Sequence, residues 1–155
     1  MDAAASILNI VQITGTLVDY LRAATQAPSD RRKLLLEAHS LYALLISLKD
    51  FLDLDDEDVQ PGWRREVGRL ASPDGPLQQY SNDLASLLTK LDPKGRLRRA
   101  GQTVLWKMAK DDVKELLMHI ERMKSLINIA LEMDQMWVRS KSTVIRTADT
   151  MQTAR

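Results

Sequence analysis

The chain has 155 residues, of which 45% are hydrophobic and 28% charged, and its formal net charge is +1. These values predict one soluble globular domain and exclude both a disordered chain and a protein that is basic throughout. The absence of cysteine excludes disulfides and cysteine-ligated zinc. Asp2 stands where the positive start of a secretory signal would lie, so the expected location is the cytoplasm.

The first predicted helix runs from Ala3 to Leu21 and carries no charge between Ala3 and Val18. Its apolar residues spread over more than one helical face, whereas a surface helix shows a narrower apolar stripe. We therefore expect it to be hidden, either inside a helical bundle or, after a rearrangement, inside a lipid bilayer. A permanent span is not expected, because sixteen uncharged residues reach only about 24 Å of a ~30 Å hydrocarbon core.

Three further helices are predicted before residue 92. Pro28 and the two residues after it start a helix that reaches Leu52, with apolar residues three and four positions apart. A short helix is expected over residues 63–70 and a longer one over residues 77–91. A Pro- and Gly-rich turn separates these last two helices.

Five carboxylates lie within the six residues from Asp53 to Asp58. A calcium-binding EF-hand loop requires glycine at its sixth position and glutamate at its twelfth, and this chain has Asp58 and Arg64 there. The run is therefore interpreted as a solvated acidic loop.

Residues 90–110 carry a local charge of seven minus one, or +6. Apolar residues and Trp106 are interleaved with these charges. Such a stretch can bind an anionic membrane surface, contact phosphate on nucleic acid, or serve as a basic loop that pairs with acidic residues. The residues considered for contact with anionic lipid are Lys94, Arg96, Arg98, Arg99 and Lys107.

The last long helix is predicted to begin at Asp111 and Asp112, with Asp112 as the N-cap and Glu115 completing a capping box. Its apolar stripe widens towards the end, and a possible partner face consists of Leu126, Ile129, Met133 and Trp137. Residues 139–155 become polar, and they fit a continued helix, a frayed tail or the start of a linker. The expected division is a bundle over residues 1–138 and a tail over 139–155.

Together these elements predict an all-α fold, a bundle of four main helices with one or two short ones. Sequence motifs for catalysis or for phosphate binding are absent, and His39 and His119 do not have metal-ligand spacing. We therefore expect a protein that is not an enzyme and that uses neither a cofactor nor a metal.

Several spaced blocks resemble the HeLo-like N-terminal domain of fungal STAND proteins, which are intracellular receptors of the NACHT and NLR-like type. The resemblance covers residues 1–134, and its blocks are ILNIVQITGTLVDYL, APSDRRKLLLEAHSLYALLISLKDFL, SPDGPLQQY and LWKMAKDDVKELLMHIERMKSLINIALEMD. Two features depart from the family. No nucleotide-binding module follows, and residues 139–155 contain no amyloid-type signalling segment, as expected of a domain excised from a larger receptor.

The resemblance implies a cell-death effector domain, as in heterokaryon incompatibility and fungal innate immunity. Activation by an upstream NACHT-type module would bring copies together, and the first helix would then leave the bundle and permeabilise the plasma membrane. The expected partners are further copies of the chain and anionic lipids, without nucleic acid. The implied insertion element lies between residues 7 and 18, and its apolar residues are Ile7, Leu8, Ile10, Val11, Ile13, Leu17 and Val18.

A second hypothesis is a helical interaction or oligomerisation module that never touches a membrane. Its natural surface would be the late apolar face of the last long helix.

Overall fold

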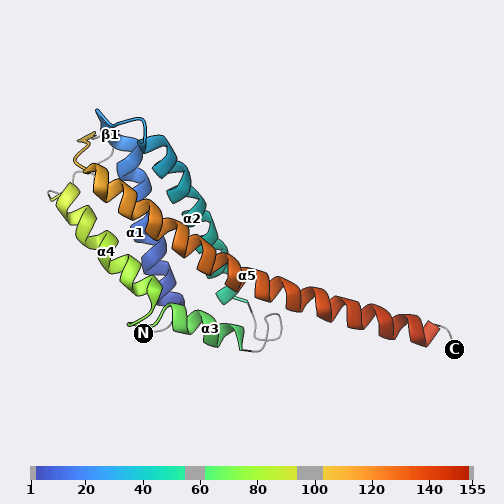
Figure 1. Ribbon diagram of the computed structural model, residues 1–155. Helices are drawn as coiled ribbons and strands as arrows, with labels where there is room; N and C mark the ends of the chain where they lie inside the picture. The colour runs from blue at the N-terminus through green and yellow to red at the C-terminus, as the bar shows by residue number, and fades with distance from the viewer. Residues whose placement is uncertain (1–2, 55–61, 94–102, 154–155) are drawn as a thin grey trace.

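The computed structural model describes residues 3–54, 62–93 and 103–153. Within the last helix, side chains are described as far as Met133 and at a few positions beyond residue 145. Five helices account for most of the described chain, so the predicted all-α bundle is confirmed (Figure 1). The helices are α1 (Ala3–Ala23), α2 (Arg31–Leu52), α3 (Trp63–Leu70), α4 (Pro76–Leu91) and α5 (Lys110–Thr153).

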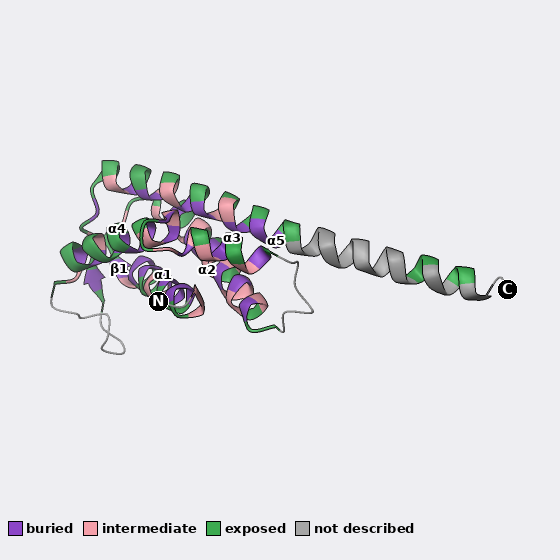
Figure 2. Ribbon diagram, turned by 90° about the horizontal axis from the view of Figure 1, so that it is seen from below, coloured by how far each residue is buried: buried purple, intermediate pink, exposed green. Residues whose placement is uncertain are grey.

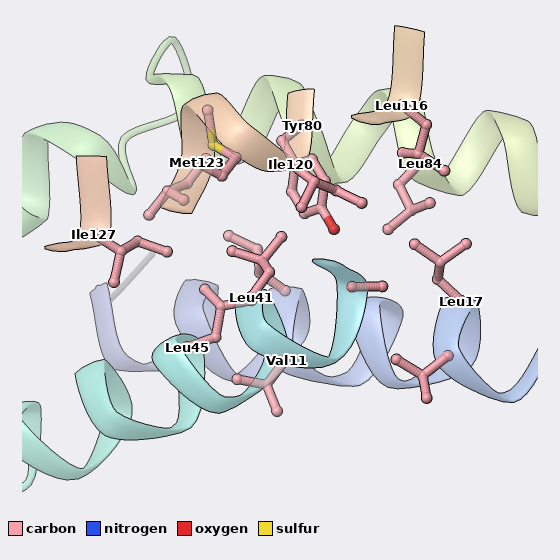
Figure 3. Close-up of a cluster of buried hydrophobic side chains, with 14 of the residues drawn as sticks. Val11, Leu17, Leu41, Leu45, Tyr80, Leu84, Leu116, Ile120, Met123 and Ile127 are labelled. Atoms are coloured by element: carbon pink, nitrogen blue, oxygen red, sulfur yellow. The ribbon is translucent and has the colours of Figure 1, made fainter. Parts of the chain in front are cut away.

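Helix α1 packs against α2 and α4, and α5 packs against α2, α3 and α4. Buried apolar side chains from α1, α2, α4 and α5 meet between the helices and form one core (Figure 3). Leu41, Leu45 and Ile120 are completely buried there. The three-and-four spacing expected from the sequence is what brings these side chains to one side of each helix.

Helix boundaries follow the local chemistry of the chain. Pro76 occupies the first turn of α4, where its missing N–H costs nothing. The preceding Gly75 is buried, and a Cβ there would lie 2.5 Å from the carbonyl oxygen of Arg69. Only glycine therefore fits this turn between α3 and α4. Helix α2 begins at Arg31, three residues after the predicted start at Pro28.

Helix α5 begins at Lys110, slightly earlier than predicted. The backbone N–H of Ala109 donates to Asp112 Oδ2 at 3.3 Å. Asp112 is thus the third residue of the helix, and its carboxylate accepts a hydrogen bond from Ala109, the residue that precedes the helix. Its predicted role as N-cap is therefore wrong. The same acidic residue still satisfies an N–H group that the helix leaves unpaired.

Helix α5 continues for 44 residues to Thr153 and projects far beyond the other helices (Figure 1). Three structures were left open for residues 139–155, and over residues 139–153, the part that is described, continued helix is the one observed. After Gly101 the sequence contains neither glycine nor proline, so no residue there breaks the helix.

Two very short strands, which the sequence analysis did not predict, form a parallel pair. They are β1 (Ala24–Thr25), directly after α1, and β2 (Val104–Leu105), shortly before α5. The pair ties the end of α1 to the segment that leads into α5.

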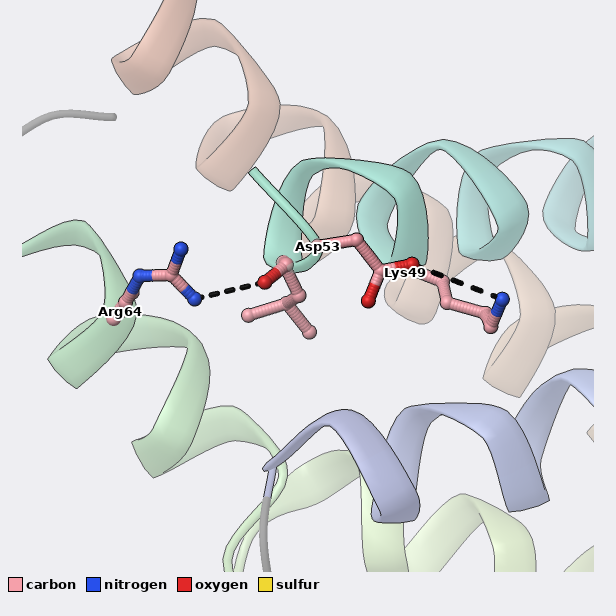
Figure 4. Close-up of polar contacts among 4 residues, drawn as sticks. Lys49, Asp53 and Arg64 are labelled. Carbon is pink, nitrogen blue, oxygen red and sulfur yellow. Dashed lines mark hydrogen bonds and ion pairs between the residues drawn. The ribbon is translucent and has the colours of Figure 1, made fainter. Parts of the chain in front are cut away.

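The acidic run begins at the end of α2, where Asp53 and Leu54 are exposed and the following residues lie outside the described part of the chain. Lys49 Nζ lies 3.9 Å from Asp53 Oδ2. The guanidinium of Arg64 donates to the carbonyl oxygens of Leu52 and Leu54, so α3 holds the end of α2. Figure 4 shows one of these two bonds beside the Lys49–Asp53 pair.

Candidate functional site

The seven residues assigned to membrane insertion all lie on α1, but they do not share one environment. Ile13 is partly buried and Leu8 is 40% exposed. The other five are buried in the bundle: Ile7, Ile10, Val11, Leu17 and Val18. Most of the proposed insertion surface is therefore part of the protein core in this conformation.

One face of α1 is open to solvent and is mainly polar. It carries Asn9, Gln12, Thr16 and Asp19, which follow one another at spacings of three, four and three residues. The expectation that α1 is hidden on every side is therefore wrong for this face (Figure 2). Leu8 lies next to Asn9 and is the large apolar side chain that α1 exposes.

A buried polar contact joins α1 to α4. Thr14 is completely buried, and its Oγ1 lies 3.1 Å from the hydroxyl oxygen of Tyr80, within hydrogen-bond distance. Burial raises the pKa of Tyr80 to about 12, and the hydrogen bond with Thr14 offsets part of that rise. The two hydroxyls satisfy each other inside the core, so separating α1 from α4 breaks a buried polar pairing.

This contact predicts a loss of stability at alkaline pH. The folded pKa of Tyr80 lies above the ordinary value of 10.0, so its contribution is complete below pH 10 and is lost as pH rises towards 12. The loss amounts to about 3 kcal/mol. Urea unfolding measured between pH 9 and pH 12 should show the decline.

The matched control is Tyr80→Phe, which has no hydroxyl to ionise. Its stability should fall less steeply over the same pH interval than that of the wild-type chain. Equal slopes for the two proteins would show that Tyr80 is not the group responsible.

The end of α1 is held by a second set of contacts, here called the clip, formed by Tyr20, Thr25, Val104, Trp106 and Lys107. The backbone N–H of Lys107 donates to the Tyr20 hydroxyl at 3.0 Å, and the Trp106 N–H donates to the Thr25 carbonyl at 3.0 Å. The rings of Tyr20 and Trp106 stack with centroids 5.9 Å apart. Burial raises the pKa of Tyr20, and the hydrogen bond from Lys107 lowers it in part.

Among the residues considered for anionic lipid, Lys107 belongs to this clip. Lys107 is exposed although its backbone N–H is engaged by Tyr20. The other four, Lys94, Arg96, Arg98 and Arg99, lie outside the described residues. Lys90 and Lys110, which bound the basic stretch, are both exposed.

The possible partner face on α5 is only partly open. Leu126 is half-buried and packs against the core, whereas Ile129 is 56% and Met133 37% exposed. The side chain of Trp137 lies outside the described residues. This face thus begins at the bundle and continues onto the part of α5 that projects from it.

A groove of about 330 Å³ lies between α4 and α5. Leu84, Leu87 and Leu116 are among its apolar lining residues. Its rim carries His119, whose Nδ1 lies 3.9 Å from Asp83 Oδ2. Among the described residues, no group of three or more histidine, cysteine, aspartate or glutamate side chains could hold a metal ion.

Comparison with known proteins gives no match to a family model, a curated protein or a solved structure. Within the described residues, α1 is the one helix long and apolar enough to cross a membrane, a criterion that core helices of soluble proteins also satisfy.

Proposed function

We propose that this chain is a cell-death effector domain of a fungal immune-type receptor, which acts by oligomerising and permeabilising the plasma membrane through α1. In this proposal the resting domain is cytoplasmic, and an upstream receptor module brings copies together. The family resemblance of the sequence motivates the proposal. The observation that supports it best is the division of α1 into a buried apolar face and an exposed polar face.

The length of α1 suits a bilayer. Its 21 residues extend about 31 Å, close to the ~30 Å of a hydrocarbon core. Lipid can replace the apolar contacts that Ile7, Ile10 and Leu17 lose when the helix leaves the bundle, since burial in either environment stabilises by about 25 cal/mol per Å².

The polar face of α1 favours insertion as an oligomer. Asn9, Gln12, Thr16 and Asp19 would be costly against acyl chains, so they must contact neighbouring helices or water. Several copies of α1 arranged with this face inwards would satisfy both requirements. They would surround a polar pathway while Ile10 and its apolar neighbours contact lipid.

The direct test is dye release from vesicles by the whole purified chain, combined with flotation of protein with those vesicles. Release that rises with protein concentration supports the proposal. A chain that self-associates by light scattering but neither floats with vesicles nor releases dye is instead an interaction module, for which the exposed Ile129 and Met133 provide a surface.

The basic stretch predicts salt-dependent binding to anionic membranes. Changing Arg96, Arg98 and Arg99 together to Gln should weaken binding to vesicles rich in anionic lipid by about 100-fold at low salt, because each surface charge contributes about 1 kcal/mol. The difference should shrink as salt is added. Flotation across a salt series measures both effects.

The control for this charge change is a second triple variant, in which Arg65, Arg69 and Arg122 become Gln. These side chains are exposed on α3 and α5, and α3 lies at the end of the bundle opposite β1 (Figure 1). Net charge falls by the same amount in both proteins. Equal weakening would assign the binding to overall charge rather than to residues 94–107.

A further inference from the structure

One end of the bundle, here called the β end, carries the β1–β2 pair and is formed by residues 20–33, 88–93 and 103–112. The end of α1, the start of α2, the end of α4 and the start of α5 meet there. Helix α3 and the part of α5 that projects from the bundle lie at the opposite end (Figure 1). Neither of them therefore prevents the β end from approaching a large flat surface.

A leucine side chain is held outward at the β end. Leu105 is 50% exposed, whereas Val104 before it is buried and Trp106 after it is half-buried. The pairing of β2 with β1 explains this alternation, because successive side chains of a strand point to opposite faces. The Trp106 N–H donates to the Thr25 carbonyl and the Trp106 ring stacks on Tyr20, so the direction of Leu105 is fixed while the clip is intact.

The exposed charge of the β end is mainly positive. Six lysine and arginine side chains are exposed there against two aspartates. These exposed residues are Arg22, Arg32, Lys33, Lys90, Lys107, Lys110, Asp30 and Asp111. Arg31, Asp92 and Asp112 are half-buried. Among the described residues of this end, Leu105 is the one large apolar side chain that is exposed, and it lies among cations.

This combination fits an anionic lipid bilayer better than a protein partner. A protein interface requires an apolar core built from many residues, and one exposed leucine does not provide it. A bilayer surface offers phosphates to the cations and an apolar boundary to the leucine, and it requires no complementary shape. The adjacent Trp106 is also a residue type enriched at membrane–water interfaces.

We propose that the β end docks on an anionic membrane, with Leu105 inserted at the boundary between headgroups and acyl chains and the exposed lysines and arginines against lipid phosphates. The inference rests on the proposed function, because it takes an anionic membrane as the partner. It adds an apolar anchor to the charge attraction of the basic stretch. The bundle then stands end-on, and the clip holds the C-terminal end of α1 at the membrane surface before that helix enters lipid.

Leu105→Ser tests the apolar anchor in the whole chain. In flotation with vesicles of phosphatidylserine and phosphatidylcholine, it should raise the lipid concentration needed for half-maximal binding about tenfold, because the buried apolar area of the leucine is lost. This ratio to the wild type should persist when salt is added, since salt screens charges and does not weaken apolar burial. The charge variants of the basic stretch should instead lose their effect.

The matched control is Leu54→Ser, the same change at a leucine that is 40% exposed on the end of α2 that α3 holds. Its binding should equal that of the wild type, and both variants should keep the circular dichroism of the parent chain. Unchanged binding by Leu105→Ser, or equal weakening by the two leucine variants, would overturn the proposal.

A fluorescent label tests the position of the β end independently of affinity. The chain has no native cysteine, so Leu105→Cys and Leu54→Cys each accept a single label whose emission shifts to the blue in an apolar medium. On the same vesicles, the label at residue 105 should respond and the label at residue 54 should not. A response at residue 54 that matches or exceeds the one at residue 105 would refute the assignment.

These outcomes are separable from those for permeabilisation. A chain that docks through residue 105 but releases no dye retains the docking surface and contradicts the proposed function. Dye release together with unchanged binding by Leu105→Ser contradicts the docking surface and leaves the proposed function in place. A wild-type chain that does not float with the vesicles refutes both.

Discussion

Leu8→Asp is expected to abolish dye release from vesicles while leaving the fold intact. Leu8 is 40% exposed in the bundle, so a charge there loses part of its apolar burial and should lower the free energy of unfolding by about 1–2 kcal/mol, well within the 5–15 kcal/mol typical of a domain. In the inserted oligomer residue 8 lies within the thickness of the hydrocarbon core, on the side of α1 that also carries Gln12 and Asp19. An aspartate there must either face acyl chains, at a cost of about 3 kcal/mol per helix, or stand against the same carboxylate of neighbouring copies. Release should therefore fall by at least about 100-fold, measured as dye released per bound protein.

The matched control is Leu36→Asp on α2, which makes the same chemical change at a side chain that is 63% exposed. Its dye release should equal that of the wild type, and both variants should still unfold cooperatively on heating, as folded chains do. If Leu8→Asp releases dye at the wild-type rate, α1 does not enter the membrane at this position and the proposed mechanism fails.

Other changes in α1 are less informative because the helix is built into the core. Val11→Asp would bury a charge at a side chain only 8% exposed, and removing residues 1–21 would take away Ile7, Ile10 and Leu17 together. Either change would unfold the bundle. A loss of dye release would then result from an unfolded protein and would not show whether α1 inserts into the membrane.

The sequence predicted the helices well because their signals are local. Apolar spacing and breakers such as Pro76 place α2, α3 and α4 within a few residues of their observed bounds. The clip could not be predicted in this way. Its hydrogen bonds join residues 79 to 87 positions apart, and strands of two residues have no periodicity to detect.

Only part of the candidate site could be predicted from the sequence. The spacing of Asn9, Gln12, Thr16 and Asp19 places a polar face on α1, although its uncharged, largely apolar start predicts burial. The exposure of Leu8 depends on which helices flank α1, and no local pattern specifies those neighbours. Thr14 and Tyr80 likewise lie 66 positions apart and become partners only through the packing of α4 on α1.

Trp63→Ala is expected to cause the largest loss of stability. Trp63 is completely buried, its ring meets that of Phe51 edge-on with centroids 6.2 Å apart, and its Nε1 donates to the Ala130 carbonyl at 2.8 Å. Truncation should lower the free energy of unfolding by about 3–5 kcal/mol, a large share of the 5–15 kcal/mol typical of a domain. Urea unfolding followed by circular dichroism measures the loss.

Two further variants separate the causes of that loss. Trp63→Phe keeps most of the apolar area but removes the hydrogen bond to Ala130, so it should cost about 1–2 kcal/mol. Trp106→Ala makes the same truncation at the half-buried ring of the clip and should cost clearly less than Trp63→Ala. Equal losses at the two tryptophans would show that burial of Trp63 does not hold the bundle together.

The position of Trp63 explains why its effect should spread beyond α3. Helix α3 has eight residues, too few to persist without packing, and Trp63 is the side chain that joins it to Ala130. Ala130 lies where α5 leaves the bundle. Losing this anchor would therefore release α3 and also loosen α5 where it leaves the bundle. The far-ultraviolet signal of Trp63→Ala should then fall over a broader range of urea concentration than that of the parent chain.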